Sequence, residues 1–258
     1  MNISFIGSGN VATVLAKLAV QAGHTIHQIY SRQPAHAEQL ARQCGAQAIS
    51  QWAQVNTQGL HVLIISVSDA AIGAAAQQLA STHCMVVHTA GTVSRQVLAG
   101  LSPNYGVLYP LQTLRANQPL PSTPLPLLVD AATPDDLAFL QNFAQSLSKL
   151  VATASDEQRR HAHLCAVICN NFTNHLAAFA QTYANAHGVD FNLLQPLLYQ
   201  TFTNISQGLA PQVQTGPAQR GDISTMEAHL ALLAQYPLAQ KWYEALSRSI
   251  WEGVKSEK

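Results

Sequence analysis

The residues with the clearest chemical potential stand at the start of the chain, in the run Gly7-Ser8-Gly9-Asn10-Val11-Ala12. A turn that presents bare main chain to a pyrophosphate needs glycine at its tight bend and at the point of closest approach. It also needs a small residue where the following helix crosses the strand. Gly7, Gly9 and Ala12 supply these in order. Because the helix start would direct unpaired amides at the phosphates, the spacing predicts a dinucleotide site.

The residues that would meet the adenosine ribose follow the second predicted strand. Enzymes that bind NAD usually place an acidic side chain about 20 residues further on, to accept from the 2′-hydroxyl. This chain has Tyr30-Ser31-Arg32-Gln33 there, with no carboxylate before Glu38. Ser31 can donate to a 2′-phosphate, and Arg32 can pair with it and stack on adenine, so the cofactor NADP(H) is favoured. The alternative is that Arg32 is a solvated surface side chain.

Two further polar runs follow apolar strands, Ser66-Val67-Ser68-Asp69 and His88-Thr89-Ala90-Gly91-Thr92. The carboxyl edge of a parallel sheet is where doubly wound folds bind ligands. Small or hydroxylic residues there would let the cofactor lie close, and the candidates are Ser66, Val67, Ser68, Thr89 and Gly91. Tyr109 ends a later strand at the same edge and is a candidate proton donor or substrate contact.

Polar side chains recur in the helical run from His161 to His175. At about 100° per residue, one third of the circumference carries His161, Ile168, Asn171, Phe172 and His175, with His163 and Asn170 on the other side. A helix interior favours neither Asn nor His, so this stripe indicates a polar pocket with His161, Asn171 and His175 as candidate catalytic residues. The alternative is that they are hydrogen-bonded core or helix-contact residues. A metal site is disfavoured because no HExxH or paired Cys/His spacing is present.

A second polar run spans Thr215 to Asp222, TGPAQRGD. Its glycines and proline impose an unusual backbone path, and Arg220 could hold an anionic substrate or order the loop. Asp222 could equally cap the helix that is predicted to start near Ser224. The sequence leaves both interpretations open.

The elements that must position these residues fall into two halves. Up to residue 154, apolar runs alternate with amphipathic stretches, which is typical of βαβ units. The predicted strands are 2–6, 25–30, 61–67, 85–89, 106–109, 127–130 and 150–154. Beyond that point helical periodicity takes over, at 156–187, 190–208, 223–235 and 238–254. The predicted fold class is therefore α/β: an N-terminal Rossmann domain with a doubly wound parallel sheet (1–154), followed by an all-α domain (155–258).

Composition narrows the function classes. Of 258 residues, 48% are hydrophobic and 10% are charged, with 13 basic side chains against 13 acidic ones. This balance provides no electrostatic footprint for nucleic acid or for an anionic membrane surface. No apolar run approaches the ~20 residues that span a bilayer, and no leader is apparent. The four cysteines show neither metal nor disulfide spacing. We expect a soluble cytoplasmic protein.

The whole chain resembles a family that joins a Rossmann-like domain to a helical C-terminal domain of unknown function, through the motifs GSGNVA, HTAGT, YPLQT, NNFTNHL and TGPAQRGD. The N-terminal half is similar to pyrroline-5-carboxylate reductases and deazaflavin-dependent NADP reductases. The two-domain plan resembles the 6-phosphogluconate and hydroxyisobutyrate dehydrogenase superfamily. The resemblance implies an NADP-dependent oxidoreductase and a homodimer formed through the helical domain.

One departure from the resemblance bears on the chemistry. The hydroxyacid branch carries a catalytic Lys a turn before an Asn, whereas this chain reads Ala166 to Asn171 there and has no Lys from 150 to 240. Hydroxyacid oxidation by that mechanism is therefore unsupported, while imine reduction needs less from the protein. We expect hydride transfer to or from a small carbonyl or imine substrate bearing a carboxylate, in the cleft between the domains. Asn171 and His175 would orient it, His161 or Tyr109 would move the proton, and Arg220 would hold the carboxylate. The alternative is a non-catalytic dinucleotide sensor or scaffold.

Overall fold

The computed structural model describes residues 1–120, 122–210 and 212–256. It forms two compact units, Met1–Ala177 and Ala178–Lys258. Pro121 and Pro211 lie outside the described residues, as do residues 257 and 258 of the predicted helical domain. In the part of the chain that is described, no helix combines the length and the apolar character needed to cross a membrane.

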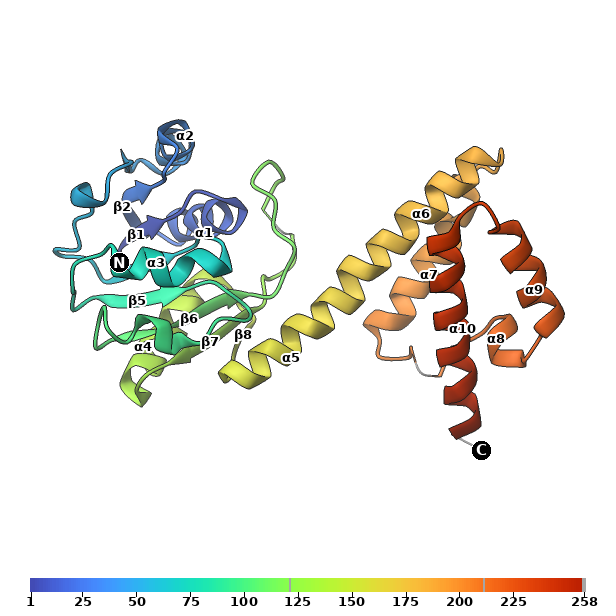
Figure 1. Ribbon diagram of the computed structural model, residues 1–258. Coiled ribbons are helices and arrows are strands. Elements are labelled where there is room, and N and C mark those ends of the chain that lie inside the picture. Colours follow the sequence, from blue (N-terminus) through green and yellow to red (C-terminus); the bar gives the residue numbers. More distant parts are fainter. Residues whose placement is uncertain (121, 211, 257–258) are drawn as a thin grey trace. The chain divides into compact units, whose positions relative to one another are not determined.

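The first unit is built on one eight-stranded sheet in the order β3-β2-β1-β4-β5-β6-β7-β8 (Figure 1). Its first six positions have the strand order of a Rossmann fold. The strands are β1 (Asn2–Ile6), β2 (Thr25–Tyr30), β3 (Gln47–Ile49), β4 (Val62–Ile65), β5 (Met85–His88), β6 (Tyr105–Pro110), β7 (Leu127–Ala131) and β8 (Val151–Thr153). The predicted fold class is confirmed.

One strand runs against the predicted parallel direction. β7 pairs antiparallel with β6, from Gly106 opposite Ala131 to Pro110 opposite Leu127, whereas every other pair is parallel. A parallel return needs a crossover, usually a helix. The described residues of the connecting segment 111–126 form neither helix nor strand. The chain therefore reverses direction, and the sheet is mostly rather than wholly parallel.

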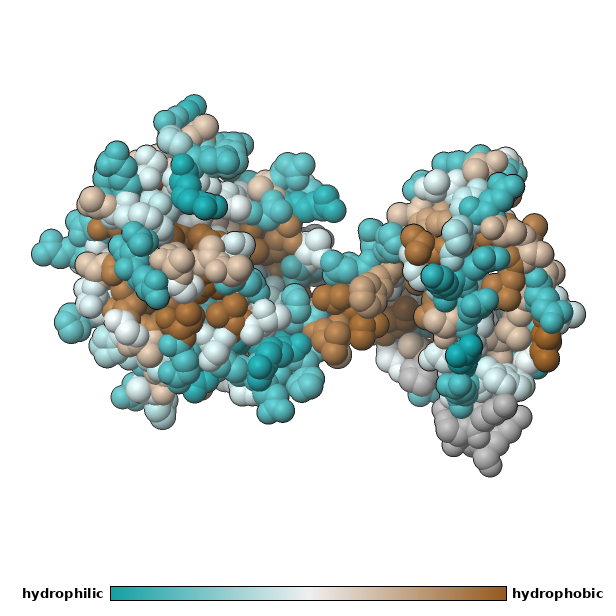
Figure 2. All heavy atoms as spheres, viewed as in Figure 1, coloured by the Kyte–Doolittle hydropathy of each residue, from teal (hydrophilic) through white to brown (hydrophobic). Residues whose placement is uncertain are grey.

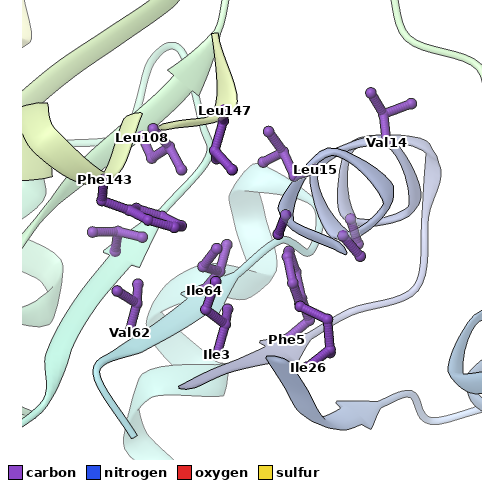
Figure 3. Packing of buried hydrophobic residues seen from close by; sticks show 14 of the residues in the cluster. Ile3, Phe5, Val14, Leu15, Ile26, Val62, Ile64, Leu108, Phe143 and Leu147 are labelled. Carbon is purple, nitrogen blue, oxygen red and sulfur yellow. The ribbon is translucent and has the colours of Figure 1, made fainter. Parts of the chain in front are cut away.

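Alternation along the central strands explains how both faces of the sheet are filled. Ile3 and Phe5 face one layer, while Ile6 faces the other. The first layer holds α1 (Asn10–Gln21), α2 (Pro34–Cys44) and α4 (Pro134–Leu147), and Figure 3 shows part of its packing. The second layer holds α3 (Ile72–Gln77) and the 3₁₀ turn Arg95–Leu98. Successive side chains of a strand point to opposite faces, so continuous apolar runs are required where both faces are covered.

A long helical stretch follows the sheet. A Ser155 capping box starts α5 (Asp156–Ala166), which continues through a π-helical segment (Val167–Phe172) into α6 (Thr173–Ala186). The remaining helices are α7 (Gln195–Ser206), α8 (Pro217–Arg220), α9 (Ile223–Leu232) and α10 (Pro237–Ser256). The sheet ends at Thr153, near the predicted boundary at 154, while the compact units divide within α6. The domain boundary at 154 stays a prediction.

The second unit has little apolar core of its own. Its described buried side chains are small, namely Ala184, Ala218 and Ala239. Aromatic rings make edge contacts around Phe179, which lies 5.8 Å from both Tyr236 and Trp242. Many larger apolar side chains remain at the surface, where Figure 2 shows them among the polar ones. Small units without a buried core are marginally stable alone.

Candidate functional site

A groove of about 930 Å³ lies along the carboxyl ends of the central strands. This is the size range of sites for cofactors and other small molecules. Most predicted cofactor residues line it: Gly7, Ser8, Gly9, Asn10, Val11, Ser31, Arg32, Ser66, Val67, Ser68 and Thr89. Their assignment as cofactor ligands stays a prediction.

The glycines at the turn fit a dinucleotide. Gly7 has φ +119°, and a β-carbon on it would lie 2.1 Å from the main-chain oxygen of Ser66. Gly9 precedes α1 with φ −77°, a conformation open to any residue, and a β-carbon there would meet nothing within 4 Å. No side chain caps this end of α1. The turn therefore leaves room beside Gly9 and amide groups that are open to an anion.

Two predicted cofactor residues have other surroundings. Ala12 is fully buried, in the layer where α1 packs on the sheet. A β-carbon on Gly91 would lie 2.8 Å from His163 Nδ1 and 3.0 Å from Tyr109 Cζ. Neither residue is among those lining the groove. Ala12 thus meets the packing requirement of the turn, and Gly91 leaves space for two side chains.

Asn10 ties the phosphate turn to the loop after β6. Its side-chain oxygen accepts a hydrogen bond from the main-chain amide of Ala116 at 2.9 Å. Lys17 Nζ lies 3.5 Å from the carbonyl oxygen of the same residue. The loop at Ala116 is thereby held against α1. This structural role of Asn10 was not apparent from the sequence.

The predicted adenosine end of the groove is aromatic and basic. Tyr30 stacks on Trp52 with ring centroids 4.0 Å apart. Burial raises the pKa of Tyr30, and the charge of nearby Arg32 partly offsets this. Arg32 is exposed and lines the groove together with His36. The sequence analysis missed Trp52 and His36, because neither residue belongs to a motif with a recognisable spacing from the phosphate-binding turn.

Beyond Thr89 the sheet edge carries a buried polar cluster. His88 is fully buried, and its Nδ1 accepts from the amide of Ala90 at 3.2 Å, so a neutral ring carries its proton on Nε2. Burial, helped by the charge of Arg159, lowers the pKa of His88 to about 4. Within the cluster Thr89 donates to Ser66 Oγ at 3.2 Å, while the exposed Thr92 donates to Asp69 Oδ2 at 2.8 Å beside it. His88 is therefore neutral at pH 7.

Arg159 is the charged residue at the centre of this cluster, with 1% of its surface exposed. It pairs with Asp156 at 2.7 Å and donates to the carbonyl oxygen of Val93. Burial raises the pKa of Asp156, but hydrogen bonds from Ser94 and Arg159 outweigh this and lower it. A buried cation is tolerated only when it is paired and hydrogen-bonded. These contacts fix the start of α5 against the loop after β5.

Tyr109 contacts His163, which helical periodicity places on the side of its helix opposite to His161, Asn171 and His175. Its hydroxyl lies 2.9 Å from Nδ1 of the partly exposed His163 on α5. Burial, then the charge of Asp69, raises the pKa of Tyr109, and Arg159 partly opposes this. Asn170 likewise contacts the sheet unit, where it donates to Thr113 Oγ1 in the loop after β6. The side of the helix that meets the sheet therefore carries His163 and Asn170.

The predicted stripe is exposed in the structure. His161, Asn171 and His175 all lie at the surface, and His161 Nε2 is 4.0 Å from Glu157 Oε1. The π-helical segment also shifts the geometry, since its i→i+5 pattern turns the chain less per residue than an α-helix. Positions after Val167 are thus rotated from those that a uniform helix predicts. The catalytic roles of these three residues stay predictions.

The TGPAQRGD run forms α8 and the start of α9 in the second unit. Asp222 caps α9 by accepting from the amide of Thr225 at 3.1 Å, and hydrogen bonds from Thr225 lower its pKa. Gly221 has φ +68°, and a β-carbon on it would lie 2.5 Å from the Trp251 ring. The helix-cap interpretation of Asp222 is confirmed. Arg220 is exposed, and its substrate role stays a prediction.

A strand–turn–helix with bare glycines, opening a sheet of Rossmann order, defines a dinucleotide-binding class of protein. Two family models match the chain. Residues 2–91 match "NADP oxidoreductase coenzyme F420-dependent", and residues 125–250 match "Domain of unknown function (DUF2520)". Among solved structures, a putative NADP oxidoreductase from Bacteroides fragilis is 36% identical with a TM-score of 0.87, over 97% of this chain and 98% of that one. The chain belongs to this family, which joins an NADP-oxidoreductase-type Rossmann domain to a DUF2520 domain.

More distant matches show the fold alone. A Thermotoga maritima protein is 20% identical with a TM-score of 0.71, over 99% of both chains. An imine reductase from Streptomyces aurantiacus is 15% identical with a TM-score of 0.64, over 99% of this chain and 95% of that one. An L-aspartate dehydrogenase from Methanospirillum hungatei is 33% identical over 72 residues, and this match spans 28% of either protein.

Membership of the family that joins an NADP-oxidoreductase-type Rossmann domain to a DUF2520 domain implies a nicotinamide dinucleotide as cofactor.

Proposed function

We propose that this protein is an NADP(H)-dependent oxidoreductase that transfers hydride to or from a small carbonyl or imine substrate bearing a carboxylate. The observation that carries the proposal is the groove in which Gly9 leaves open space beside the main chain and which Arg32 also lines. When bound, the dinucleotide supplies the hydride. The chain's own residues hold it, through the amides at the start of α1 and the hydroxyls of Ser66, Ser68 and Thr89.

Arg32 supports NADP(H) rather than NAD(H). The groove residues after β2 are Ser31, Arg32, Gln33 and His36, and none is acidic. A guanidinium pairs with phosphate through two parallel hydrogen bonds, whereas a carboxylate would repel it. The Bacteroides fragilis relative carries the same cofactor in its name. The substrate class is supported by the absence of Lys from 150 to 240 and by the names of the imine reductase and the L-aspartate dehydrogenase. The expectation that the substrate binds between the domains stays a prediction.

Arg32→Asp tests the cofactor choice. We expect the Kd of NADPH to rise about a hundredfold, because a charge-assisted pair worth about 1.5–3 kcal/mol is replaced by repulsion. The Kd of NADH should change by less than about threefold, since its ribose carries no phosphate. Isothermal titration of both dinucleotides measures this, with the exposed Arg42→Asp as the matched control. Equal losses for the two cofactors would contradict the assignment.

We also propose that a second copy of the chain covers the apolar surface of the helical unit. Exposed large apolar side chains include Val189, Leu193, Leu197, Tyr199, Phe202, Ile205, Leu209, Ile223, Leu232, Leu238 and Leu246. Many of the larger apolar side chains of this unit are at its surface, while its buried residues, among those described, are alanines. Exposed apolar side chains in this number favour an interface, and most oligomers are homo-oligomers with C₂ symmetry.

Sedimentation analysis tests the dimer. With a chain mass of 27.7 kDa, we expect the wild-type protein to sediment at twice that mass and Phe202→Asp to sediment as a monomer. Val20→Asp, at an exposed apolar position on α1 of the sheet unit, is the matched control and should stay dimeric. A wild-type protein that stays monomeric at tens of micromolar would refute the proposal.

A further inference from the structure

The contact between Tyr109 and His163 joins two elements at the groove end of the sheet. Tyr109 lies near the carboxyl end of β6, and His163 lies on α5, with 2.9 Å between Oη and Nδ1. The rings meet edge to face, with centroids 6.0 Å apart. Since 54 residues separate the two in sequence, the contact depends on α5 docking against the sheet.

Gly91 is the residue that makes room for this pair. Any side chain at position 91 would press on His163 Nδ1 and on the Tyr109 ring, because a β-carbon would lie within about 3 Å of both. Thr89, two positions earlier in the chain, lines the groove. The loop after β5 therefore contacts the proposed cofactor groove at one residue and the Tyr109–His163 pair at another.

The charge of Asp69 links the Tyr109–His163 pair to the groove. Asp69 lines the groove, and its carboxylate is close enough to raise the pKa of Tyr109, as does burial of the phenol. Arg159 opposes this less strongly. Tyr109 therefore carries its proton at pH 7, as an ordinary phenol does, and its place beside the groove rests on the contacts with His163 and Gly91. His163 is partly exposed, so water can reach its ring.

We infer that Tyr109 and His163 form a proton-supplying pair, in which Tyr109 protonates the substrate heteroatom and His163 returns a proton to Tyr109. This inference rests on the proposed oxidoreductase function. In the direction of reduction, the substrate carbon gains a hydride from the reduced dinucleotide, and its nitrogen or oxygen gains the proton from the Tyr109 O–H bond. The phenolate then takes the Nδ1 proton of His163 while Nε2 of the same ring takes a proton from solvent, so that the imidazole stays neutral as it relays the proton. One hydride and one proton thus enter the substrate, and the oxidised dinucleotide leaves.

The first test needs no turnover. In protein labelled at tyrosine and histidine, we expect NADPH to shift the NMR signals of both Tyr109 and His163. The same dinucleotide without its nicotinamide, 2′-phospho-ADP-ribose, should leave both signals in place, because the pair lies beyond the phosphates. Tyr105, at the amino end of β6 with its hydroxyl on Gln96, is the control and should respond to neither. If NADPH binds and leaves both signals unmoved, the pair does not face the nicotinamide and the inference is wrong.

The second test separates proton supply from mere packing. With a panel of cyclic imines and 2-oxo acids, Tyr109→Phe should lower kcat about 10²–10⁴-fold, the usual contribution of a general acid. The Kd of NADPH should stay within about twofold, since the step lost is made only in the transition state. His163→Ala should lower kcat and regain it with added imidazole, which a packing residue would not. Tyr105→Phe should leave kcat unchanged.

The outcomes distinguish the inference from the function beneath it. If the wild-type protein reduces a substrate and Tyr109→Phe keeps the same kcat, the pair's role fails while the oxidoreductase function stands. If the wild-type protein binds NADPH and reduces no member of the panel, the proposed function fails, and the proton-supplying role fails with it. The non-catalytic sensor interpretation would then account better for the absent Lys.

Discussion

Gly9→Ala should weaken dinucleotide binding at least a hundredfold in a protein that still folds, whereas Gly7→Ala should destabilise the fold itself. Gly9 has φ −77° and open space around its missing side chain, so Gly9→Ala meets no protein atom. That open space is where the pyrophosphate would approach the main chain. We expect the Kd of NADPH to rise at least a hundredfold, or about 2.7 kcal/mol, with the melting temperature unchanged.

Gly7→Ala acts on the protein instead. Its φ of +119° is a backbone conformation that alanine rarely adopts, and the new methyl would overlap the Ser66 carbonyl between β1 and β4. Strain and backbone displacement together should cost about 3 kcal/mol or more. Gly100→Ala, at a glycine with open surroundings and no positive φ, should change neither stability nor binding. Denaturation curves and NADPH titrations of the three variants check this; a Gly9→Ala protein that binds NADPH normally would remove the phosphate role of the turn.

Stability should fall as the pH drops from 7 to 5, and His88 should be the main cause. In the fold the pKa of His88 is about 4, against an ordinary value of 6.5. Between these values the unfolded chain binds the proton more strongly, so acidification favours unfolding. The contribution is complete above pH 6.5 and is lost as the pH falls towards 4. At 1.36 kcal/mol per pH unit, the loss should reach about 2 kcal/mol by pH 5 and about 3 kcal/mol by pH 4.

Urea denaturation at pH 7 and pH 5 measures this effect, because few carboxylates titrate in that interval. His88→Gln should remove most of the pH dependence while lowering stability at pH 7, since the amide replaces a well-packed ring. The same replacement at the exposed His83 should leave the dependence as in the wild-type protein. If His88→Gln keeps the full wild-type slope, the buried imidazole is not its origin.

The sheet could be predicted closely because its signals are local. Apolar runs bounded by Gly and polar residues placed β1 and β2 at their observed bounds. β3 was missed because three residues carry no periodicity. The antiparallel direction of β7 was missed. Apolar patterns predict a strand, but they do not show whether a crossover helix connects it to the strand before.

The candidate site was predictable only where it is contiguous in sequence. The phosphate turn and the residues after β2, β4 and β5 line one groove, as parallel strands that end at one edge require. Helical periodicity could not predict which side of α5 meets the sheet, because this depends on how α5 docks, through Arg159, Asp156 and the loop after β5. The π-helical segment added a rotation that a period of 3.6 cannot predict.

Direct titration of NADPH and NADH into the purified protein tests the central claim most plainly. The claim is that a bare glycine turn holds the pyrophosphate while Arg32 meets a phosphate on the adenosine ribose. It predicts that both dinucleotides bind at a single site per chain and that NADPH binds at least about tenfold more tightly. Tighter binding of NADH, or no heat and no thermal stabilisation with either dinucleotide, would contradict it.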